Sequence, residues 1–226
     1  MIVLGFDTAT PRTAVALLDD MTHNLGEAVH DPEPGERPGH ASQLLPLALQ
    51  LIDEAGLTFA DVQRLAVGVG PGTFTGLRIG LATARSLAQA TRAELVGVSS
   101  LEALAEPVDA PAVLAVLDAR RGEAFVGGWA GAREVLAPRA LTPDALARVD
   151  PPNTGGTWLA VGDGAVRFRA VLERAGVTVP PDDDPAHRIS ALATCRLAAK
   201  VREPAVRDAL VPTYLRQPDA TTSRRD

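Results

Sequence analysis

The sequence is poor in cysteine, lysine and aromatic residues, and each shortage limits the structures or functions that the chain can have. Cys195 is the only cysteine among 226 residues, so no disulfide can form within the chain, which fits a reducing cytoplasm. Aromatic residues make up 4% of the chain, so its core must be built from alanine, valine and leucine. Lys200 is the only lysine and the formal net charge is -6, which disfavours tight binding of RNA by this chain alone.

Long hydrophobic runs are also missing from the sequence. No stretch approaches the ~20 apolar residues that a membrane-spanning helix needs, so we expect no membrane span and a cytoplasmic protein. The apolar run over residues 2–6 is followed by Asp7 and has no basic region before it, which predicts a strand rather than a signal peptide. Cys195 falls in a predicted helix, where we expect it to be buried and unreactive.

The residue patterns of common catalytic and metal sites are absent from the sequence. The four histidines, His23, His30, His40 and His187, include no pair at the short helical spacing that binds a metal ion. No G-x-S-x-G segment is present, so serine-hydrolase chemistry has no local support. We therefore assign no catalytic residue and no metal ligand.

The most distinctive stretch of the chain covers residues 64–90. It predicts a strand over 65–69, a glycine-rich turn over 70–76 with Thr73 or Thr75 as helix cap, and a helix over 77–90. Three interpretations compete: a phosphate-binding loop, a tight internal turn, and a helix face for a partner chain. The pattern G-x-x-x-x-G-K-[ST] fails because Leu77 and Arg78 follow Gly76. A small residue recurs every four positions in the helix, at Gly76, Gly80, Ala84 and Ala88.

Periodicity along the rest of the chain predicts two similar halves. The first half is predicted to begin with strands 2–6, 13–18 and 25–30, followed by helix 41–55 with Pro46 inside it. Strand 65–69 and helix 77–90 come next, then strand 94–98 and a helix that Ser99 caps and that ends near residue 105. The second reads as strands 112–118, 123–129 and 133–137, a helix after the cap Thr142, strand 158–161, helix 165–175, strand 177–179 and helix 188–201, with Ser190 as an alternative cap.

This order, βββαβαβα repeated, predicts an α/β fold of two ribonuclease-H-like lobes, the architecture of the actin/sugar-kinase/heat-shock-protein superfamily. We expect residues 1–105 to form the first lobe and residues 106–226 the second. The C-terminal helix and tail are expected to pack back on the first lobe.

The glycine-rich run G-V-G-P-G-T-F-T-G-L-R-I-G-L-A-T-A-R-S-L-A resembles the signature of the TsaB (YeaZ-type) family. Three other segments resemble motifs of that family: D-A-R-R-G-E at 118–123, G-D-G at 162–164 and P-T-Y-L-R at 212–216. The resemblance implies a non-catalytic partner of a TsaD-like catalytic subunit. Together with a TsaE-like ATPase, these form N6-threonylcarbamoyladenosine beside the anticodon of tRNAs that read codons beginning with A.

The resemblance also implies how ligands and partners are reached. The complex would use ATP and reach tRNA, whereas this chain alone would bind no cofactor tightly. We expect two first-lobe helices to pack against equivalent partner helices as a four-helix cluster, and to form a homodimer in isolation. The predicted interface residues are Leu44, Leu45, Ala48, Leu51, Ile52, Leu77, Gly80, Leu81, Ala84, Leu87 and Ala88.

Asp7, Thr8, Gly162 and Gly164 stand where the superfamily holds nucleotide phosphates, so they are candidate vestigial nucleotide-binding residues. The competing interpretation of Asp7 is a side chain that organises its own turn. Two other function classes stay open: an independent nucleotide-dependent phosphotransferase or glycopeptidase, and an RNA-binding module. The proline-rich segment 31–39 and the acidic segment 182–184 have no counterpart in the family pattern.

Overall fold

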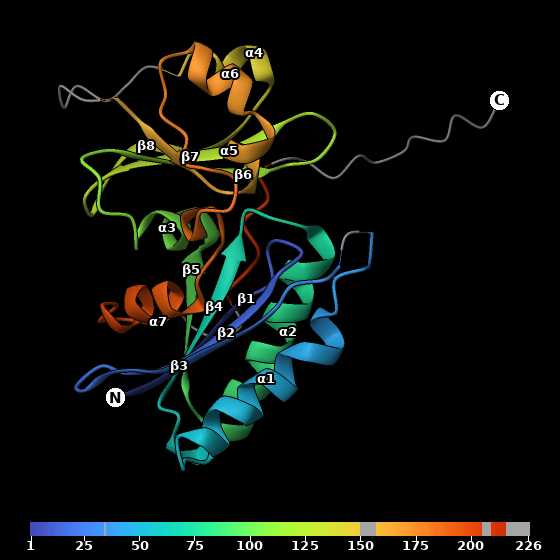
Figure 1. The fold of residues 1–226 in the computed structure, drawn as a ribbon. Coiled ribbons are helices and arrows are strands. Elements are labelled where there is room, and N and C mark those ends of the chain that lie inside the picture. The colour runs from blue at the N-terminus through green and yellow to red at the C-terminus, as the bar shows by residue number, and fades with distance from the viewer. Residues whose placement is uncertain (34, 150–156, 205–208, 216–226) are drawn as a thin grey trace.

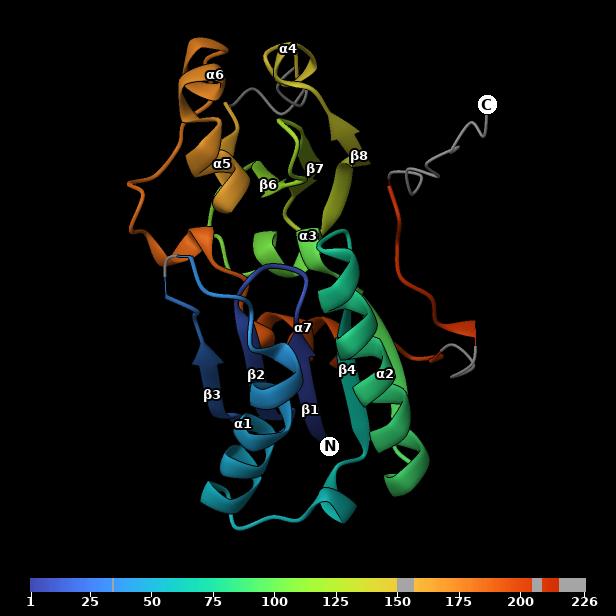
Figure 2. The same cartoon turned by 90° about the vertical axis from the view of Figure 1, so that its right-hand side faces the viewer.

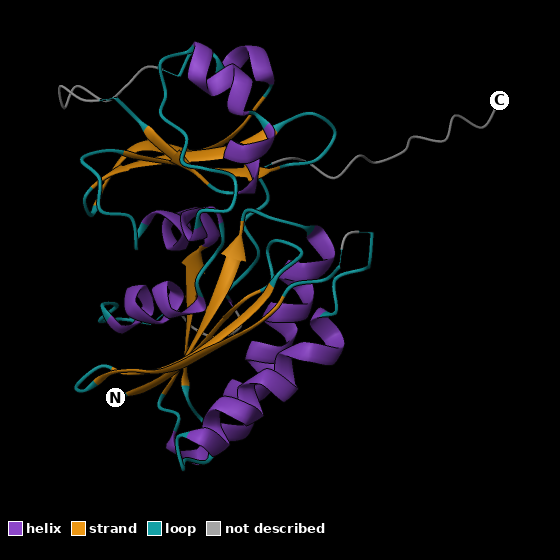
Figure 3. Cartoon of the chain, in the orientation of Figure 1, coloured by secondary structure: helices purple, strands orange, loops and turns teal. Residues whose placement is uncertain are grey.

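The chain forms two β-sheets, one above the other, in a computed structural model that describes residues 1–33, 35–149, 157–204 and 209–215 (Figure 1). Helices lie against the faces of both sheets (Figure 3). Predicted features at 150–156 and at Arg216 lie outside the described residues.

The first sheet has five strands in the order β3-β2-β1-β4-β5. They are β1 (Ile2–Asp7), β2 (Thr13–Asp19), β3 (His23–His30), β4 (Arg64–Gly70) and β5 (Glu94–Ser99). β1 is antiparallel to β2 and parallel to β4. The central strands read as continuous apolar runs because helices cover both faces of the sheet.

Two long helices cover one face of this sheet and the C-terminal helix covers the other (Figure 2). They are α1 (His40–Glu54), α2 (Phe74–Thr91) and α7 (Ala191–Ala199), and the short α3 (Ser100–Ala105) follows β5. Cys195 of α7 is fully buried on β1, where Gly5 leaves room for its sulfur. The prediction of a buried cysteine is confirmed, and burial raises the pKa of its thiol.

Arg64, at the start of β4, ties the first sheet to the end of α7. Its guanidinium group is buried and donates hydrogen bonds to the carbonyl oxygens of Ala198 at 2.7 Å and Val201 at 2.8 Å. Its Nε donates to Glu94 at 2.9 Å. One cation thus binds carbonyl groups in the last turn of α7 and just beyond it.

The second sheet has four strands in the order β8-β7-β6-β9. They are β6 (Val113–Asp118), β7 (Ala124–Ala130), β8 (Arg133–Leu141) and β9 (Leu159–Val161). The remaining helices are α4 (Pro143–Leu146), α5 (Asp163–Arg167), α6 (Arg169–Arg174) and the 3-10 turns Phe59–Asp61 and Pro185–His187. One face of this sheet packs on α5 and α6, and the other on α3, which lies between the two sheets (Figure 1).

The first βββαβαβα unit matches the predicted order, and the second departs from it in three places. Residues 177–179 form only one bridge, between Thr178 and Leu159, instead of a strand. The predicted helix 165–175 is two helices, because Phe168 leaves helical geometry with its ring buried in the core. The predicted helix 188–201 is shorter and starts after Ser190.

Three of the predicted helix caps are confirmed. Ser99 accepts a hydrogen bond from the Glu102 backbone N–H, and Thr142 and Ser190 make the same type of bond. The cap of α2 was predicted wrongly. Thr73 occupies the cap position but its side chain accepts no capping bond, and Thr75 lies inside the helix.

Candidate partner interface and inter-lobe cleft

Asp7 is the last residue of β1, and its carboxylate is enclosed by the protein. One oxygen accepts a hydrogen bond from the Ala9 backbone N–H at 2.7 Å, and the other accepts one from the Ser100 hydroxyl at 2.7 Å. Burial raises the pKa of Asp7, and these two hydrogen bonds oppose that rise. Both carboxylate oxygens are therefore engaged inside the protein, as the turn-organising interpretation predicted.

Glycines near the end of β4 and at the start of α2 let these two elements approach the β1–β2 turn closely. A Cβ atom on Gly68 would overlap the Asp7 carboxylate, and one on Gly76 would overlap the Thr8 carbonyl oxygen. The Thr8 hydroxyl donates a hydrogen bond to the Gly76 carbonyl at 2.8 Å. This confirms the tight internal turn.

The G-D-G turn of the second lobe is packed in the same way. Gly162 has a φ of 112°, a conformation that favours glycine, and its added Cβ would overlap the Val116 carbonyl oxygen. An added Cβ on Gly164 would lie 2.7 Å from the Leu117 carbonyl carbon. The Gly162 backbone N–H donates a hydrogen bond to Nδ1 of His187 at 3.1 Å. These glycines let the turn pack closely against β6.

Asp163, between the two glycines, joins the G-D-G turn to the D-A-R-R-G-E hairpin. Its carboxylate accepts a hydrogen bond from the Asp118 backbone N–H at 2.9 Å. Burial raises the pKa of Asp163 more than this hydrogen bond lowers it. The Asp118 carboxylate in turn pairs with Arg167 at 2.7 Å and with Arg120 at 3.2 Å. The two family-like motifs thus form one polar cluster.

A cavity of about 240 Å³ opens between the lobes beside this cluster, with Arg12, Asp163 and Arg188 in its wall. The Arg12 guanidinium is held by Asp31 at 2.8 Å, which gives the proline-rich segment 31–39 an anchor. None of the four predicted nucleotide-binding residues lines this cavity. Their assignment as vestigial nucleotide-binding residues stays a prediction; in the structure each of them takes part in packing or hydrogen bonding within its own lobe.

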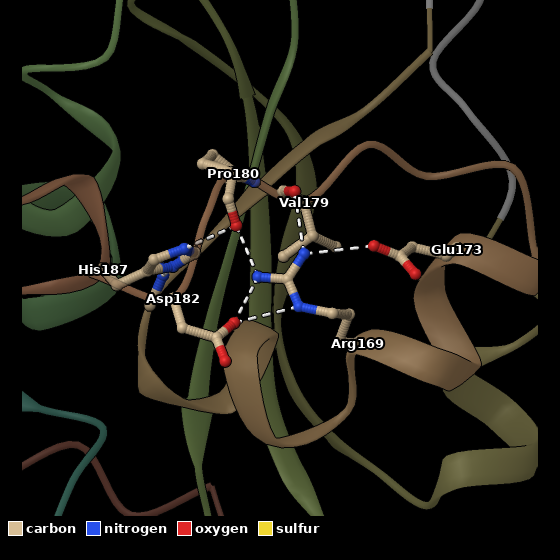
Figure 4. Close-up of polar contacts among 7 residues, drawn as sticks. Arg169, Glu173, Val179, Pro180, Asp182 and His187 are labelled. Carbon is tan, nitrogen blue, oxygen red and sulfur yellow. Dashed lines mark hydrogen bonds and ion pairs between the residues drawn. The ribbon is translucent and has the colours of Figure 1, made fainter. Parts of the chain in front are cut away.

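The acidic segment 182–184 has a structural role (Figure 4). Arg169 of α6 donates hydrogen bonds to the Asp182 carboxylate at 3.0 Å and to the carbonyl oxygen of Pro180. The same carbonyl lies 3.2 Å from Nε2 of His187. Because Nδ1 of His187 accepts a bond from Gly162, the neutral ring carries its proton on Nε2 and donates it to Pro180. Residues 180–187, which include the acidic segment, therefore connect α6 to the G-D-G turn.

Most of the predicted interface residues lie inside the protein's own core, so this part of the prediction is wrong. Only Leu45 is exposed and Leu87 half-buried. The buried ones are Leu44, Ala48, Leu51, Ile52, Leu77, Gly80, Leu81, Ala84 and Ala88. The stripe of small residues faces the first sheet and the β1–β2 turn, where Gly80 would bring a Cβ to 2.5 Å from the Thr8 hydroxyl.

α1 and α2 nevertheless present a second, outward surface. We define the exposed helix face as Leu45, Leu49 and Gln50 of α1 with Arg78, Ala82 and Ser86 of α2, all exposed. Leu45 and Leu49, one helical turn apart, are 44% and 47% exposed. Leu49 was missed in the sequence, although α1 carries apolar residues on two sides, a pattern typical of a helix with two packing partners.

Neither a metal site nor a membrane span is found in the part of the chain that the structure describes. No three or more His, Cys, Asp or Glu side chains there are grouped so that they could hold a metal ion. None of the described helices combines the length and the apolar character needed to cross a membrane.

Comparison with known proteins identifies close sequence relatives. The family model described as "TsaD: tRNA N6-adenosine threonylcarbamoyltransferase" matches residues 32–149. The Escherichia coli "tRNA threonylcarbamoyladenosine biosynthesis protein TsaB" is 30% identical over 230 residues, which cover 96% of this chain and 95% of that protein. A Sphingopyxis alaskensis tRNA N6-adenosine threonylcarbamoyltransferase is 34% identical over 112 residues, 45% of this chain and 33% of the relative.

Solved structures agree with the two-lobed architecture. YeaZ from Pseudomonas aeruginosa has a TM-score of 0.77 at 29% identity, with 95% of this chain and 99% of that chain covered. A ROK hexokinase from Thermus thermophilus has a TM-score of 0.52 at 16% identity, with 88% and 100% covered. The second likeness shows the fold alone, which is that of two ribonuclease-H-like lobes in the actin/sugar-kinase/heat-shock-protein superfamily.

Proposed function

Because the chain belongs to the TsaB (YeaZ-type) family of tRNA threonylcarbamoyladenosine biosynthesis proteins, we propose that it is the non-catalytic subunit that binds a TsaD-like catalytic chain. The observation that carries the proposal is the exposure of Leu45 and Leu49 on α1. Two leucines one turn apart on a solvent-facing helix provide an apolar strip that a partner helix can cover.

The resemblance to the transferases supports the choice of partner. The family model for TsaD covers both α1 and α2. Two chains that share this helix pair can face each other across a local twofold axis, so that equivalent helices meet in a four-helix cluster. In this arrangement the partner supplies the catalytic residues. A TsaE-like ATPase completes the complex, which uses ATP and engages tRNA, and this chain alone binds no cofactor tightly.

The test replaces Leu45 and Leu49 together by glutamate and measures binding to the TsaD-like protein of the same organism by calorimetry. Two charges in a desolvated apolar contact should weaken binding by at least about a hundredfold. Met21→Glu, which adds a charge at a side chain 79% exposed in the β2–β3 turn, is the matched control. Unchanged binding by the folded double variant would refute the exposed helix face as the interface.

Depletion of the chain in cells tests the biological role. Nucleoside analysis of bulk tRNA should then show a loss of N6-threonylcarbamoyladenosine, which the wild-type gene restores and the Leu45→Glu/Leu49→Glu variant does not. The alternative of an independent phosphotransferase or glycopeptidase predicts tight binding of ATP and magnesium by the isolated chain. We expect calorimetry to detect none, because Asp7 and Thr8 are already engaged by Ala9, Ser100 and Gly76.

A further inference from the structure

A second, larger cavity of about 460 Å³ lies on another side of the molecule, and the proposed function makes no use of it. Its wall includes residues of β5, α3, β6, β7 and the end of α7, so residues of both sheets line it. It shares no lining residue with the inter-lobe cavity beside Asp163. A volume of this size, formed where two lobes meet, is typical of small-molecule sites.

The charges of this cavity are unevenly paired. Glu106 accepts hydrogen bonds from Arg196 at 2.7 and 3.0 Å, and Nζ of Lys200 lies 3.8 Å from it. Glu102, one turn earlier on α3, also lines the cavity. Within the described part of the chain, its carboxylate takes part in no hydrogen bond or ion pair.

The surroundings of Glu102 disfavour its negative charge. Partial burial is the largest cause of its raised pKa, and the carboxylates of Glu134 and Glu106 add to it, while Lys200 opposes it. An additional cation beside Glu102 would relieve this penalty. Of the cations already present, Arg196 is hydrogen-bonded to Glu106, and Lys200, whose charge acts on Glu102, has its Nζ 3.8 Å from Glu106.

The rest of the wall selects the kind of cation. Trp129 of β7 and Leu197 of α7 line the cavity together with Val108 and Val113. Indole and aliphatic groups suit a carbon stem, and indole also attracts ammonium and guanidinium groups. A metal ion is a poor fit, because the described residues offer no group of three metal-binding side chains.

We propose that this cavity binds a small organic amine, with its ammonium or guanidinium group beside Glu102 and its carbon stem against Trp129 and Leu197. The site would give the protein a small-molecule ligand held between its two lobes. It is independent of the exposed helix face, which lies on α1 and α2.

The test is calorimetry of the full chain with 2-phenylethylamine and with agmatine, which carry an aromatic and an aliphatic stem. The neutral 2-phenylethanol and the anionic 3-phenylpropionate are the matched probes. We expect at least one of the two amines to bind at least tenfold more tightly than either 2-phenylethanol or 3-phenylpropionate. Glu102→Gln should weaken the binding of that amine at least tenfold. Ala132→Phe, at an exposed position of the cavity wall, should block it as well.

Glu54→Gln on α1 is the control, because it removes the same charge at an exposed position far from the cavity in the sequence and on another helix. It should leave amine binding unchanged. The proposal is overturned if neither amine binds, if the alcohol or the acid binds as well, or if Glu102→Gln and Glu54→Gln have equal effects. Binding of the TsaD-like chain should be the same for all these variants. A failure of the amine-binding proposal can therefore be distinguished from a failure of the proposed function.

Discussion

Gly76 faces the carbonyl oxygen of Thr8, and this one contact explains why glycine occupies this position of α2. The same holds for Gly68 against Asp7. The sequence shows that glycine is repeated here, which indicates a close neighbour. It does not show whether that neighbour is a phosphate, a partner chain or the protein's own backbone, because all three need the same empty space.

Replacing Gly76 by alanine should lower the free energy of unfolding by about 1–3 kcal/mol, because the added methyl group must displace the Thr8 backbone. The loss should appear even though alanine favours a helix by roughly 1 kcal/mol over glycine. Urea denaturation measures it. Thr75→Ala, at the exposed neighbouring position, should stay within about 0.5 kcal/mol of wild type. Equal stability of both variants would contradict the close approach.

Asp7→Asn should stabilise the protein at about pH 7. The folded-state pKa of Asp7 is raised, so its ionised form opposes folding above that pKa, and the penalty disappears as the pH falls through the folded pKa towards 3.8. Asparagine keeps an oxygen for the Ala9 N–H and gains an N–H for the Ser100 hydroxyl oxygen.

The measurement for Asp7 is the free energy of unfolding of both proteins between about pH 7 and pH 4. The advantage of the variant should shrink as the pH is lowered. Ser100→Ala is the companion variant, because it removes one hydrogen bond from the carboxylate and should lower stability at about pH 7. A variant Asp7→Asn that is less stable than wild type at about pH 7 would show that the charge itself supports the fold.

At the scale of elements, the strands of the first lobe and three of the helix caps could be predicted because their signals are local. Ser99, Thr142 and Ser190 lie just before helical patterns, where a hydroxyl can only serve the next turn. The strands of the second lobe are harder to predict from the sequence. Residues 177–179 have β-branched side chains, but β9 is only three residues long and gives them a single bridge. Pairing length depends on tertiary packing, which the local pattern does not contain.

The candidate interface also shows how far prediction from the sequence reaches, here for the faces of a single helix. α1 and α2 were identified as helices with surplus apolar and small residues. The sequence does not distinguish the buried face of each helix from its exposed face, because α1 carries apolar residues on both faces. Leu44 and Leu45 are adjacent in the chain and are 1% and 44% exposed. Only the position of the sheet beneath the helix decides between them.

Arg64→Met should destabilise the protein by about 2–3 kcal/mol, because the carbonyl groups of Ala198 and Val201 lose their buried donor while the hydrocarbon packing is kept. Thermal and urea unfolding both report this change. Arg139→Met on β8 is the control, since this arginine is exposed and its Nε donates a hydrogen bond to the carbonyl oxygen of its near neighbour Ala137. A similar, small effect of the two substitutions would mean that Arg64 does not hold the end of α7.

At the scale of the whole molecule, the exposed helix face predicts self-association when no partner is present. A single apolar patch can pair with its copy across a twofold axis, so the isolated chain should form a homodimer. Analytical ultracentrifugation should find a concentration-dependent dimer for wild type and for Met21→Glu. Leu45→Glu/Leu49→Glu should be monomeric at the same concentrations, and a persistent dimer in this variant would locate self-association elsewhere.

α7 lies on the first sheet although almost the whole second lobe precedes it in the chain. During translation, the surface formed by Val3, Ala16 and Ala66 therefore stays uncovered until the segment around Cys195 has left the ribosome. The first part to be synthesised is thus among the last to be finished. A nascent chain halted after α3 would display a bare β-surface of the kind that chaperones capture.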